Sequence, residues 1–557
     1  MSRSIGPRRT RFLTVALLAG AIGWAWLAGA SVGHAQSGQP DQPSPTPLPD
    51  PVTPAVPQDA PAVLFSDGAV PLVTSFHVHS TASTGDLTLD QLATQAEDLG
   101  IEAIVLTENF VLQYEYGLFP WRSVIKAKVS FPSVLDYGVE RYFAEVADVQ
   151  ARHPKVLLVP GMEITPHYYW TGSLFSGDLT MFNGQKNILV FGLPGPSDYL
   201  TLPVNGNPGS YRFDAGLLVQ ALPVALLIPA VWCWRRRDDG RRRALWAGLL
   251  AALAGLLLFN ARPYGDPQFA IYDAGLRYRP YQTLIERVEA LGGVTIWSMP
   301  EAKDFHEYGL GPFGVLTIKT NPYPEALQLT RGYTAFGSIY QDTRTVTQPG
   351  GIWDELLTLP DRYRKGLPPW GVGEIAFHGL NRDTRELDQV LTVFGVRQRT
   401  AAGIVEALKT GRSYAVGQYR SKTRLRLEEF RVGCHAEDPG ATSGETLTPA
   451  PSCAVTVSVR VSAADPPPMP VTVTVVRSGQ VMGKASGPLP FVQRFVDPTP
   501  SADARGVYRV IVEGQEVELL SNPIFVEPIP AGTDAVPASP GDAADPGPPP
   551  PSDEVRS

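Results

Sequence analysis

The chain has 557 residues, enough for roughly two to four domains, and a net charge of −8 from 47 Lys and Arg against 55 Asp and Glu. Because this balance lacks the broad basic surface of nucleic-acid-binding proteins, we expect no nucleic-acid partner. Charged residues make up only 18% of the sequence, which predicts long uncharged segments, and three cysteines are too few for a disulfide-rich scaffold or a thiolate metal cage.

Residues 1–35 have the three regions of a secretory signal peptide: several arginines, an apolar run over 12–30, and small Gly33 and Ala35 at the −3 and −1 positions. Export is predicted. An uncleaved signal anchor is the alternative, because the apolar run exceeds the usual upper limit of about 15 residues. Proline recurs nearly every other residue within 36–62, which predicts an extended linker, and the Pro-rich tail over 528–557 is predicted to be disordered.

A transmembrane hairpin is predicted over 215–260, in the middle of the chain. Residues 215–234 and 244–260 carry no charge, and between them the loop 235–243 holds six arginines. By the positive-inside rule this loop is cytoplasmic, so the flanking domains lie outside the cytoplasm, in the periplasm or at the cell surface. The alternative is a pair of buried helices in a soluble domain, which a six-arginine turn disfavours. The sequence therefore predicts a protein of the cytoplasmic membrane.

The segments on either side of this hairpin, 63–211 and 263–418, both predict alternating strands and helices. Continuous apolar strands separated by helices are typical of a parallel sheet or barrel, and neither half is complete by itself. We therefore predict one α/β domain interrupted by the hairpin. The predicted strands are 73–79, 101–107, 155–164, 187–193, 294–298 and 373–378. The predicted helices are 89–99, with Thr88 as a candidate N-cap, 137–150, 281–290, 351–357 and 400–409.

From residue 422 to 527 the pattern changes to alternation with a period of two, which predicts a small antiparallel β domain, a sandwich. Cys434 and Cys453 both fall within it, on the side of the membrane where disulfides persist, so a bond between them is predicted. Cys233 lies in a membrane span and is interpreted as an apolar packing residue.

Candidate metal ligands occur where apolar strands end. His77 and His79 close one strand, and alternation places both imidazoles on one face. Glu163 and His378 end two further strands. Imidazole and carboxylate at the carboxyl ends of barrel strands suit Zn, Fe or Mn. The alternative is that these are polar strand ends whose side chains are already hydrogen-bonded.

These motifs resemble, in order, those of the polymerase and histidinol phosphatase (PHP) family over about 72–414, without the hairpin. The resemblance implies a distorted (β/α)7 barrel that holds up to three divalent ions and hydrolyses phosphoesters. It rests on Phe76-His77-Val78-His79-Ser80, Leu106-Thr107-Glu108-Asn109, Gly161-Met162-Glu163, 187–192, 292–302 and 404–414. The β domain, with 521–526, looks like that of secreted members.

The ligand set departs from the family pattern. Only His77, His79, Glu163 and His378 match, and Glu108 keeps a carboxylate where the family has Asp. The resemblance therefore implies at most one divalent ion (Zn, Mn or Fe), held by the first three, with His378 as a fourth ligand or a proton donor and Glu108 as a possible ligand. Asp86 or His167 could substitute locally. The family's other ligand positions hold Thr84, Asn109, Gln185, Met299 and Ala376.

Two functions follow as expectations. The first is a membrane-anchored extracytoplasmic hydrolase of the metal-dependent phosphoesterase type, with activity weakened or lost and a phosphoester as the ligand. The second is an inactive PHP pseudoenzyme that binds a cell-envelope ligand, for which the aromatic run Tyr168, Tyr169 and Trp170 offers contacts. Bound metal together with phosphodiester hydrolysis distinguishes them.

Overall fold

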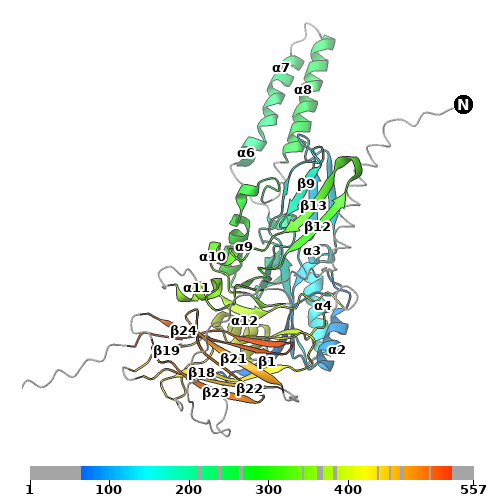
Figure 1. The fold of residues 1–557 in the computed structure, drawn as a ribbon. Coiled ribbons are helices and arrows are strands. Elements are labelled where there is room, and N and C mark those ends of the chain that lie inside the picture. The colour runs from blue at the N-terminus through cyan, green and yellow to red at the C-terminus, as the bar shows by residue number, and fades with distance from the viewer. Residues whose placement is uncertain are drawn as a thin grey trace, which may run out of the picture.

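The structure is a computed structural model and contains α-helices and many β-strands (Figure 1). The predicted signal peptide, the predicted linker and nearly all of the predicted tail lie outside the residues that it describes. The described ranges are 64–210, 216–235, 240–262, 268–340, 344–359, 368–379, 385–435, 438–450, 453–463, 469–500 and 504–529.

The first strands of the α/β part divide between two sheets. β1 (Val70–Val78), β2 (Ala103–Leu106) and β6 (Leu157–Val159) are parallel neighbours in one sheet. Along the chain, β2 is followed by β3 (Glu108–Asn109) and β6 by β7 (Gly161–Ile164). β3 and β7 pair with each other in the second sheet. The predicted strand 155–164 is therefore two strands. Pro160 separates them, and proline has no N–H to donate to a ladder.

The second sheet joins the two segments that flank the apolar hairpin. Its order is β15-β14-β11-β10-β7-β3. β10 precedes the hairpin and β11 follows it, and they pair directly, with Phe191 opposite Val294. The α/β part is thus built from both segments. The strands added here are β10 (Ile188–Phe191), β11 (Val294–Trp297), β14 (Ala335–Ile339) and β15 (Trp370–Gly373).

β10 runs antiparallel to both of its neighbours, which corrects the expectation of an all-parallel sheet. Between β7 and β10 the chain has no helix. It forms β8 (Tyr169–Thr171) and β9 (Asp178–Phe182), which pair as an antiparallel hairpin. Since a parallel neighbour requires a crossover connection and an antiparallel one does not, this connection returns the chain in the opposite direction.

The segment after β15 is hydrogen-bonded to β1. Ile375 N donates to Phe76 O at 3.0 Å, Phe377 N to His77 O at 3.0 Å, and His79 N to Phe377 O at 2.9 Å. This segment therefore links the end of the second sheet, at β15, to β1 of the first sheet. The side chains between them form a continuous buried apolar core that includes Phe76, Leu189 and Ile296.

Amphipathic helices cover these sheets. The predicted cap Thr88 accepts a hydrogen bond from Gln91 N, and the Gln91 side chain accepts from Thr88 N, so α2 begins with a reciprocal capping box. Gly411, with φ +73°, ends α12 in the left-handed conformation that favours glycine. The main helices are α2 (Leu89–Asp98), α4 (Val139–Arg152), α9 (Arg279–Ala290), α11 (Ile352–Thr358) and α12 (Ala401–Thr410).

An accessory lobe extends from the α/β part and was not anticipated from the sequence. It contains a four-stranded sheet, in the order β12-β13-β9-β8, and the hairpin β4–β5. Its own apolar core includes Tyr114, Trp170 and Leu316. The new strands are β4 (Gln113–Gly117), β5 (Lys126–Ser130), β12 (Asp304–Gly309) and β13 (Val315–Thr320).

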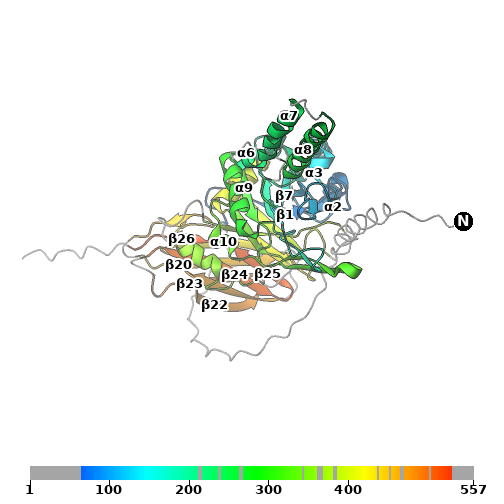
Figure 2. The same ribbon diagram turned by 90° about the horizontal axis from the view of Figure 1, so that it is seen from above.

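The predicted transmembrane segment forms a helical hairpin that projects from the body (Figure 1). Residues 218–235 and 240–261 are long and apolar enough to cross a membrane, and only 6% of each is buried. By themselves, two such helices are weak evidence for a membrane protein. α7 (Leu227–Arg235) and α8 (Gly240–Ala261) lie side by side in both views (Figure 2), preceded by the short α6 (Gly216–Gln220).

The C-terminal region is mainly antiparallel β structure, in two layers around a second apolar core. One layer is β18 (Leu425–Gly433), β20 (Thr456–Ala463) and β23 (Phe491–Val496). The other contains β21 (Pro470–Arg477), β22 (Gln480–Pro488), β24 (Gly506–Gly514) and β25 (Val517–Ser521).

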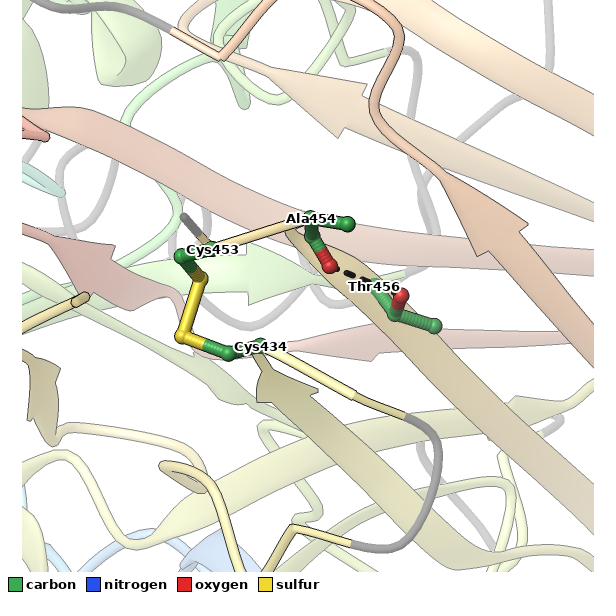
Figure 3. The surroundings of a disulfide bond; sticks show 4 residues. All are labelled: Cys434, Cys453, Ala454 and Thr456. Atoms are coloured by element: carbon green, nitrogen blue, oxygen red, sulfur yellow. Dashed lines mark hydrogen bonds between the residues drawn. A yellow bond between two sulfur atoms is a disulfide. The ribbon is translucent and has the colours of Figure 1, made fainter. Parts of the chain in front are cut away.

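The second of these layers does not stop at the predicted domain boundary. β25 pairs with β17 (Ser413–Gln418), which pairs with β16 (Val390–Val396), which in turn pairs with β1. One sheet therefore connects the C-terminal region to the α/β part. Cys434 and Cys453 form a disulfide at the end of β18, with their Cα atoms 4.6 Å apart (Figure 3).

Candidate metal centre

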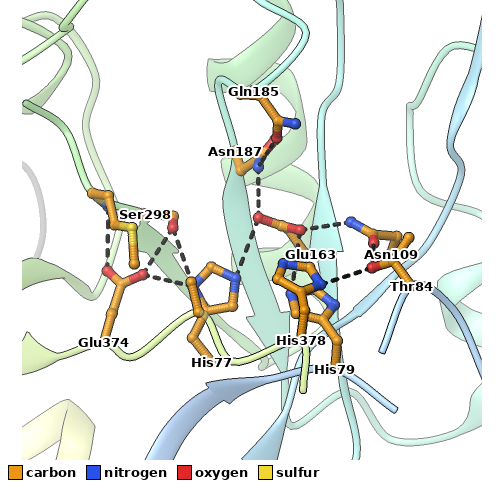
Figure 4. Close-up of polar contacts among 12 residues, drawn as sticks. His77, His79, Thr84, Asn109, Glu163, Gln185, Asn187, Ser298, Glu374 and His378 are labelled. Atoms are coloured by element: carbon orange, nitrogen blue, oxygen red, sulfur yellow. Dashed lines mark hydrogen bonds and ion pairs between the residues drawn. The ribbon is translucent and has the colours of Figure 1, made fainter. Parts of the chain in front are cut away.

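Polar side chains from several strands meet at one edge of the α/β sheets (Figure 4). His77 and His79 lie at the end of β1, Asn109 in β3 and Glu163 in β7. Asn187 immediately precedes β10. Because β10 is antiparallel, its first residues lie at the same edge as the carboxyl ends of the parallel strands.

Three of the predicted ligands converge. His77 Nε2 lies 3.3 Å from Glu163 Oε1, and His79 Nε2 lies 3.6 Å from Glu163 Oε2. All three side chains are buried, and one donor atom from each lies within 4.8 Å of the others. Ligand atoms about 2.0–2.1 Å from a tetrahedral ion are about 3.4 Å apart, so these distances fit one divalent ion.

A buried carboxylate, Glu374, orients His77. Its Oε2 lies 2.9 Å from His77 Nδ1 and accepts from Ser298 Oγ at 2.8 Å, and its Oε1 accepts from Met299 N at 3.4 Å. A Cβ on Gly337 would lie 2.1 Å from Oε1, so only glycine admits this carboxylate. A carboxylate that holds one imidazole nitrogen leaves the other, here Nε2, to a metal ion.

Two amides hold Glu163 from the other side. Asn109 Nδ2 donates to Oε2 at 2.6 Å and Asn187 Nδ2 donates to Oε1 at 2.5 Å. Thr84 Oγ1 donates to Asn109 Oδ1 at 2.6 Å, which sets the orientation of that amide. Thus Thr84 and Asn109, which stand where the resemblance places ligands, instead support the remaining carboxylate. Each carboxylate oxygen keeps a second lone pair for an ion.

The electrostatics favour a cation. Burial by itself lowers the pKa of His77, but the charges and hydrogen bonds of Glu163 and Glu374 raise it to about 9. Burial by itself raises the pKa of Glu163, but the charge of His77 holds it below its ordinary value. Two carboxylates thus face one imidazolium in a buried site. A divalent ion held by His77 Nε2 would take the place of the proton on that nitrogen and balance the two carboxylate charges.

The other two predicted ligands lie next to this cluster and are not part of the three-donor group. The His378 ring stacks on His79 with centroids 4.0 Å apart, and its Nδ1 lies 3.1 Å from Thr84 Oγ1. Glu108 is buried and accepts from Ser80 N at 2.8 Å and from Ser83 Oγ. Burial raises the pKa of Glu108 to about 7.

The backbone is strained around this site. His77, Met299 and Ala376 have φ values of +75°, +40° and +48°, in the left-handed region that costs about 1–3 kcal/mol for a non-glycine residue. The β1–β2 register shifts between Phe76 and Val78, so His77 is an extra residue in the strand. The prediction that both imidazoles share one face of the strand assumed that side chains alternate regularly along it. The structure instead brings both imidazoles to Glu163 through this irregularity.

The sequence analysis missed Glu374, Asn187 and Ser298. For Glu374 a signal was present, because it is the single charged residue within 369–377, a segment that is otherwise apolar or glycine. The suggested substitutes do not join the three-donor cluster. His167 is buried elsewhere, with Nε2 3.0 Å from Ala270 O, and Asp86 N donates to His378 O at 2.7 Å.

No family model and no curated protein matches this sequence. Among solved structures, the chain is similar to a two-domain protein from Bacteroides vulgatus that contains a predicted PHP-like metal-dependent phosphoesterase. The TM-score is 0.32 and the identity 12%, over 82% of this chain and 95% of that one.

Two further solved structures are similar over a smaller part of this chain. A proposed metal-dependent phosphoesterase from Bifidobacterium adolescentis has a TM-score of 0.24 and 13% identity, over 55% of this chain and 87% of that one. An amidohydrolase from Chromobacterium violaceum, with bound sulfate and no metal, has a TM-score of 0.24 and 14% identity, over 56% and 89%. Since all three TM-scores are low, the case for a metal centre rests on this chain's own residues.

Proposed function

We propose that this protein is a membrane-anchored, extracytoplasmic protein of the PHP type whose buried site holds one divalent ion and hydrolyses phosphoesters slowly. The observation that carries the proposal is the convergence of His77 and His79 on Glu163, with nitrogen–oxygen distances of 3.3 and 3.6 Å. Two imidazoles and one carboxylate leave a coordination position open, as catalytic sites of this ligand number do.

The roles of the surrounding residues follow from their contacts. A bound divalent ion supplies Lewis acidity toward a phosphoryl oxygen. Glu374 holds the Nδ1 proton of His77, and the amides of Asn109 and Asn187 fix the position of the Glu163 carboxylate. His378 is partly exposed and lies beside His79, where it can give a proton to a leaving group. Met299 and Ala376 offer no donor for a second ion, so the rate is expected to be low.

A ligand-binding module is the second candidate, and one observation favours it. Both oxygens of Glu163 already accept hydrogen bonds from Asn109 and Asn187, so this carboxylate is satisfied by the protein alone. In that case the site recognises an envelope ligand without turning it over.

Elemental analysis of the full chain, purified in detergent, tests both candidates. We expect at most one divalent ion per chain, lost when His77 and His79 are both replaced by Ala while cooperative unfolding is retained. His153→Ala is the matched control, because that imidazole contacts Asp90 and Glu97 outside the cluster. Hydrolysis of bis(p-nitrophenyl) phosphate that requires the ion supports the hydrolase, and binding of an ion without hydrolysis supports the module. Two or three ions per chain would refute the ligand assignment.

The topology that we propose places the loop 235–243 in the cytoplasm and the α/β and β regions outside. Its support is the charge of that loop between two apolar spans. The test is labelling of single cysteines in intact cells with a membrane-impermeant maleimide, in a Cys233→Ser background. A cysteine at Ser66 should react and one at Arg241 should not, and the reverse pattern would invert the topology.

We also propose that the two α/β segments form one closed ring of seven strands. The support is the β10–β11 pairing and the hydrogen bonds from 375–377 to β1. A variant in which a short Gly/Ser linker replaces residues 209–265 should remain folded and unfold in one transition. Two separate transitions would contradict a shared core.

A further inference from the structure

Two phenylalanines are unusually exposed for their size. Outside the apolar hairpin, Phe119 at 78% and Phe175 at 76% are the most exposed large apolar side chains of the described residues. Both lie in loops of the accessory lobe, and the same lobe exposes Val124, Ile125 and Val315. An exposed apolar patch of this kind marks an interaction surface.

These side chains lie in or directly after three loops that meet at one end of the lobe, with Val315 as the first residue of β13. The loops are 118–125 between β4 and β5, 172–177 between β8 and β9, and 310–314 between β12 and β13. Leu174 N donates to Tyr116 Oη at 3.4 Å, which joins the second loop to the β4–β5 hairpin. Val315 N donates to Gly177 O at 3.0 Å, which joins the second loop to the third.

The same end of the lobe is hydrogen-bonded to the end of α8. Asn260 Nδ2 donates to Pro120 O at 2.9 Å, Ser123 N donates to Asn260 Oδ1 at 3.1 Å, and Ser123 Oγ donates to Asn260 O at 2.8 Å. Figure 1 shows the β12–β13 hairpin reaching the level at which α8 meets the body. These hydrogen bonds fix the position of this end of the lobe relative to α8.

The position of Asn260 fixes the depth of the loops in a membrane. It follows the apolar run 244–259 directly, so in a spanning α8 it lies at the boundary between hydrocarbon and water. The loop 118–125, which is hydrogen-bonded to Asn260, then lies at headgroup level, and the other two loops lie at the same end of the lobe. Aromatic side chains are favoured at this depth, and the exposed Arg122, whose guanidinium lies 3.6 Å from the centroid of Tyr272, suits the phosphates there.

We propose that the three loops insert their exposed apolar side chains into the outer leaflet of the bilayer that holds the hairpin. This inference rests on the proposed anchoring and adds a second, peripheral contact with the lipid. A hairpin alone leaves the body free to tilt. Contact through Phe119 and Phe175 would restrict that tilt and hold the metal site at a defined height above the membrane.

The test uses single cysteines in the full chain, in a Cys233→Ser background, labelled with an NBD fluorophore and placed in phosphatidylcholine nanodiscs. Phe119→Cys and Phe175→Cys report on the loops and Leu249→Cys on α8. Val481→Cys, 51% exposed in β22 of the C-terminal region, is the matched control in water. With brominated acyl chains we expect quenching of several-fold at positions 119, 175 and 249, and none at 481.

Each outcome is decisive. If the probe at Leu249 is quenched and those at Phe119 and Phe175 are not, the loops stay in water and the inference is wrong while the anchor stands. If the probe at Leu249 is not quenched either, the proposed anchoring fails as well. Blue-shifted emission at the loops without quenching would mean that protein covers them, which also overturns insertion into lipid.

Discussion

The substitution Glu374→Gln tests the candidate metal centre through a residue outside the group of three converging ligands. In the structure Oε2 faces His77 Nδ1 at 2.9 Å and Ser298 Oγ at 2.8 Å. A glutamine of the same shape can keep both contacts with its single oxygen. It loses the negative charge, and its amide nitrogen then faces Met299 N, which is also a donor.

The expected effect on metal affinity follows from these contacts. The charge of Glu374 makes the His77 imidazole a stronger ligand, and loss of such a supporting carboxylate weakens metal binding about 10–100-fold, or about 1.4–2.7 kcal/mol. In the variant, the glutamine amide nitrogen and Met299 N are both donors and face each other. One buried polar group is then left without a partner, which lowers the free energy of unfolding by about 1–3 kcal/mol. The variant should therefore fold and bind the ion more weakly.

Competition with a chromogenic chelator measures the affinity of the full chain, in detergent, for the divalent ion. Urea denaturation measures whether each variant is folded and how stable it is. Glu108→Gln is the matched control: it is also a buried carboxylate, but it contacts Ser80 and Ser83 and not His77. We expect the control to leave the affinity unchanged. Equal affinity of the folded Glu374→Gln variant and the parent chain would refute the orienting role, and a larger loss in the Glu108 variant would identify that residue as a ligand.

Three further outcomes are expected. Gly337→Ala should lower the affinity for the ion about tenfold in the same chelator assay, since the added Cβ would lie 2.1 Å from the Glu374 carboxylate that orients the His77 imidazole. Gly309→Ala, whose added Cβ has no atom within 4 Å, should leave the affinity unchanged. Replacing Cys434 and Cys453 by Ser opens a bridge between residues 19 apart and should destabilise the C-terminal region by roughly 3 kcal/mol, and an unchanged urea midpoint would contradict this. Burial lowers the pKa of His167 below its ordinary 6.5, so below pH 6.5 the unfolded chain binds more protons than the folded chain. The free energy of unfolding should therefore be highest above pH 6.5 and fall as the pH decreases. His167→Gln should flatten that dependence, and an identical pH profile of the two proteins would show that this imidazole does not contribute.

Local signals in the sequence were sufficient for the features that depend on neighbours in the chain. Thr88 was identified as a cap because a capping box spans only four residues, and the apolar hairpin was identified because length and composition alone define it. The polar strand ends at His77 and Glu163 were visible for the same reason. Each interrupts or closes an apolar run, and strand ends from one sheet gather at one edge.

What only the tertiary structure decided are the contacts between distant segments. Glu374 lies 297 residues from His77, and no local pattern says which buried carboxylate will face an imidazole. The antiparallel direction of β10, the accessory lobe and the continuation of one sheet through β17 and β25 are likewise long-range pairings. The physical reason is that periodicity records which side of a strand is buried. The partner strand, its direction and its register are selected by the packing of the complete core.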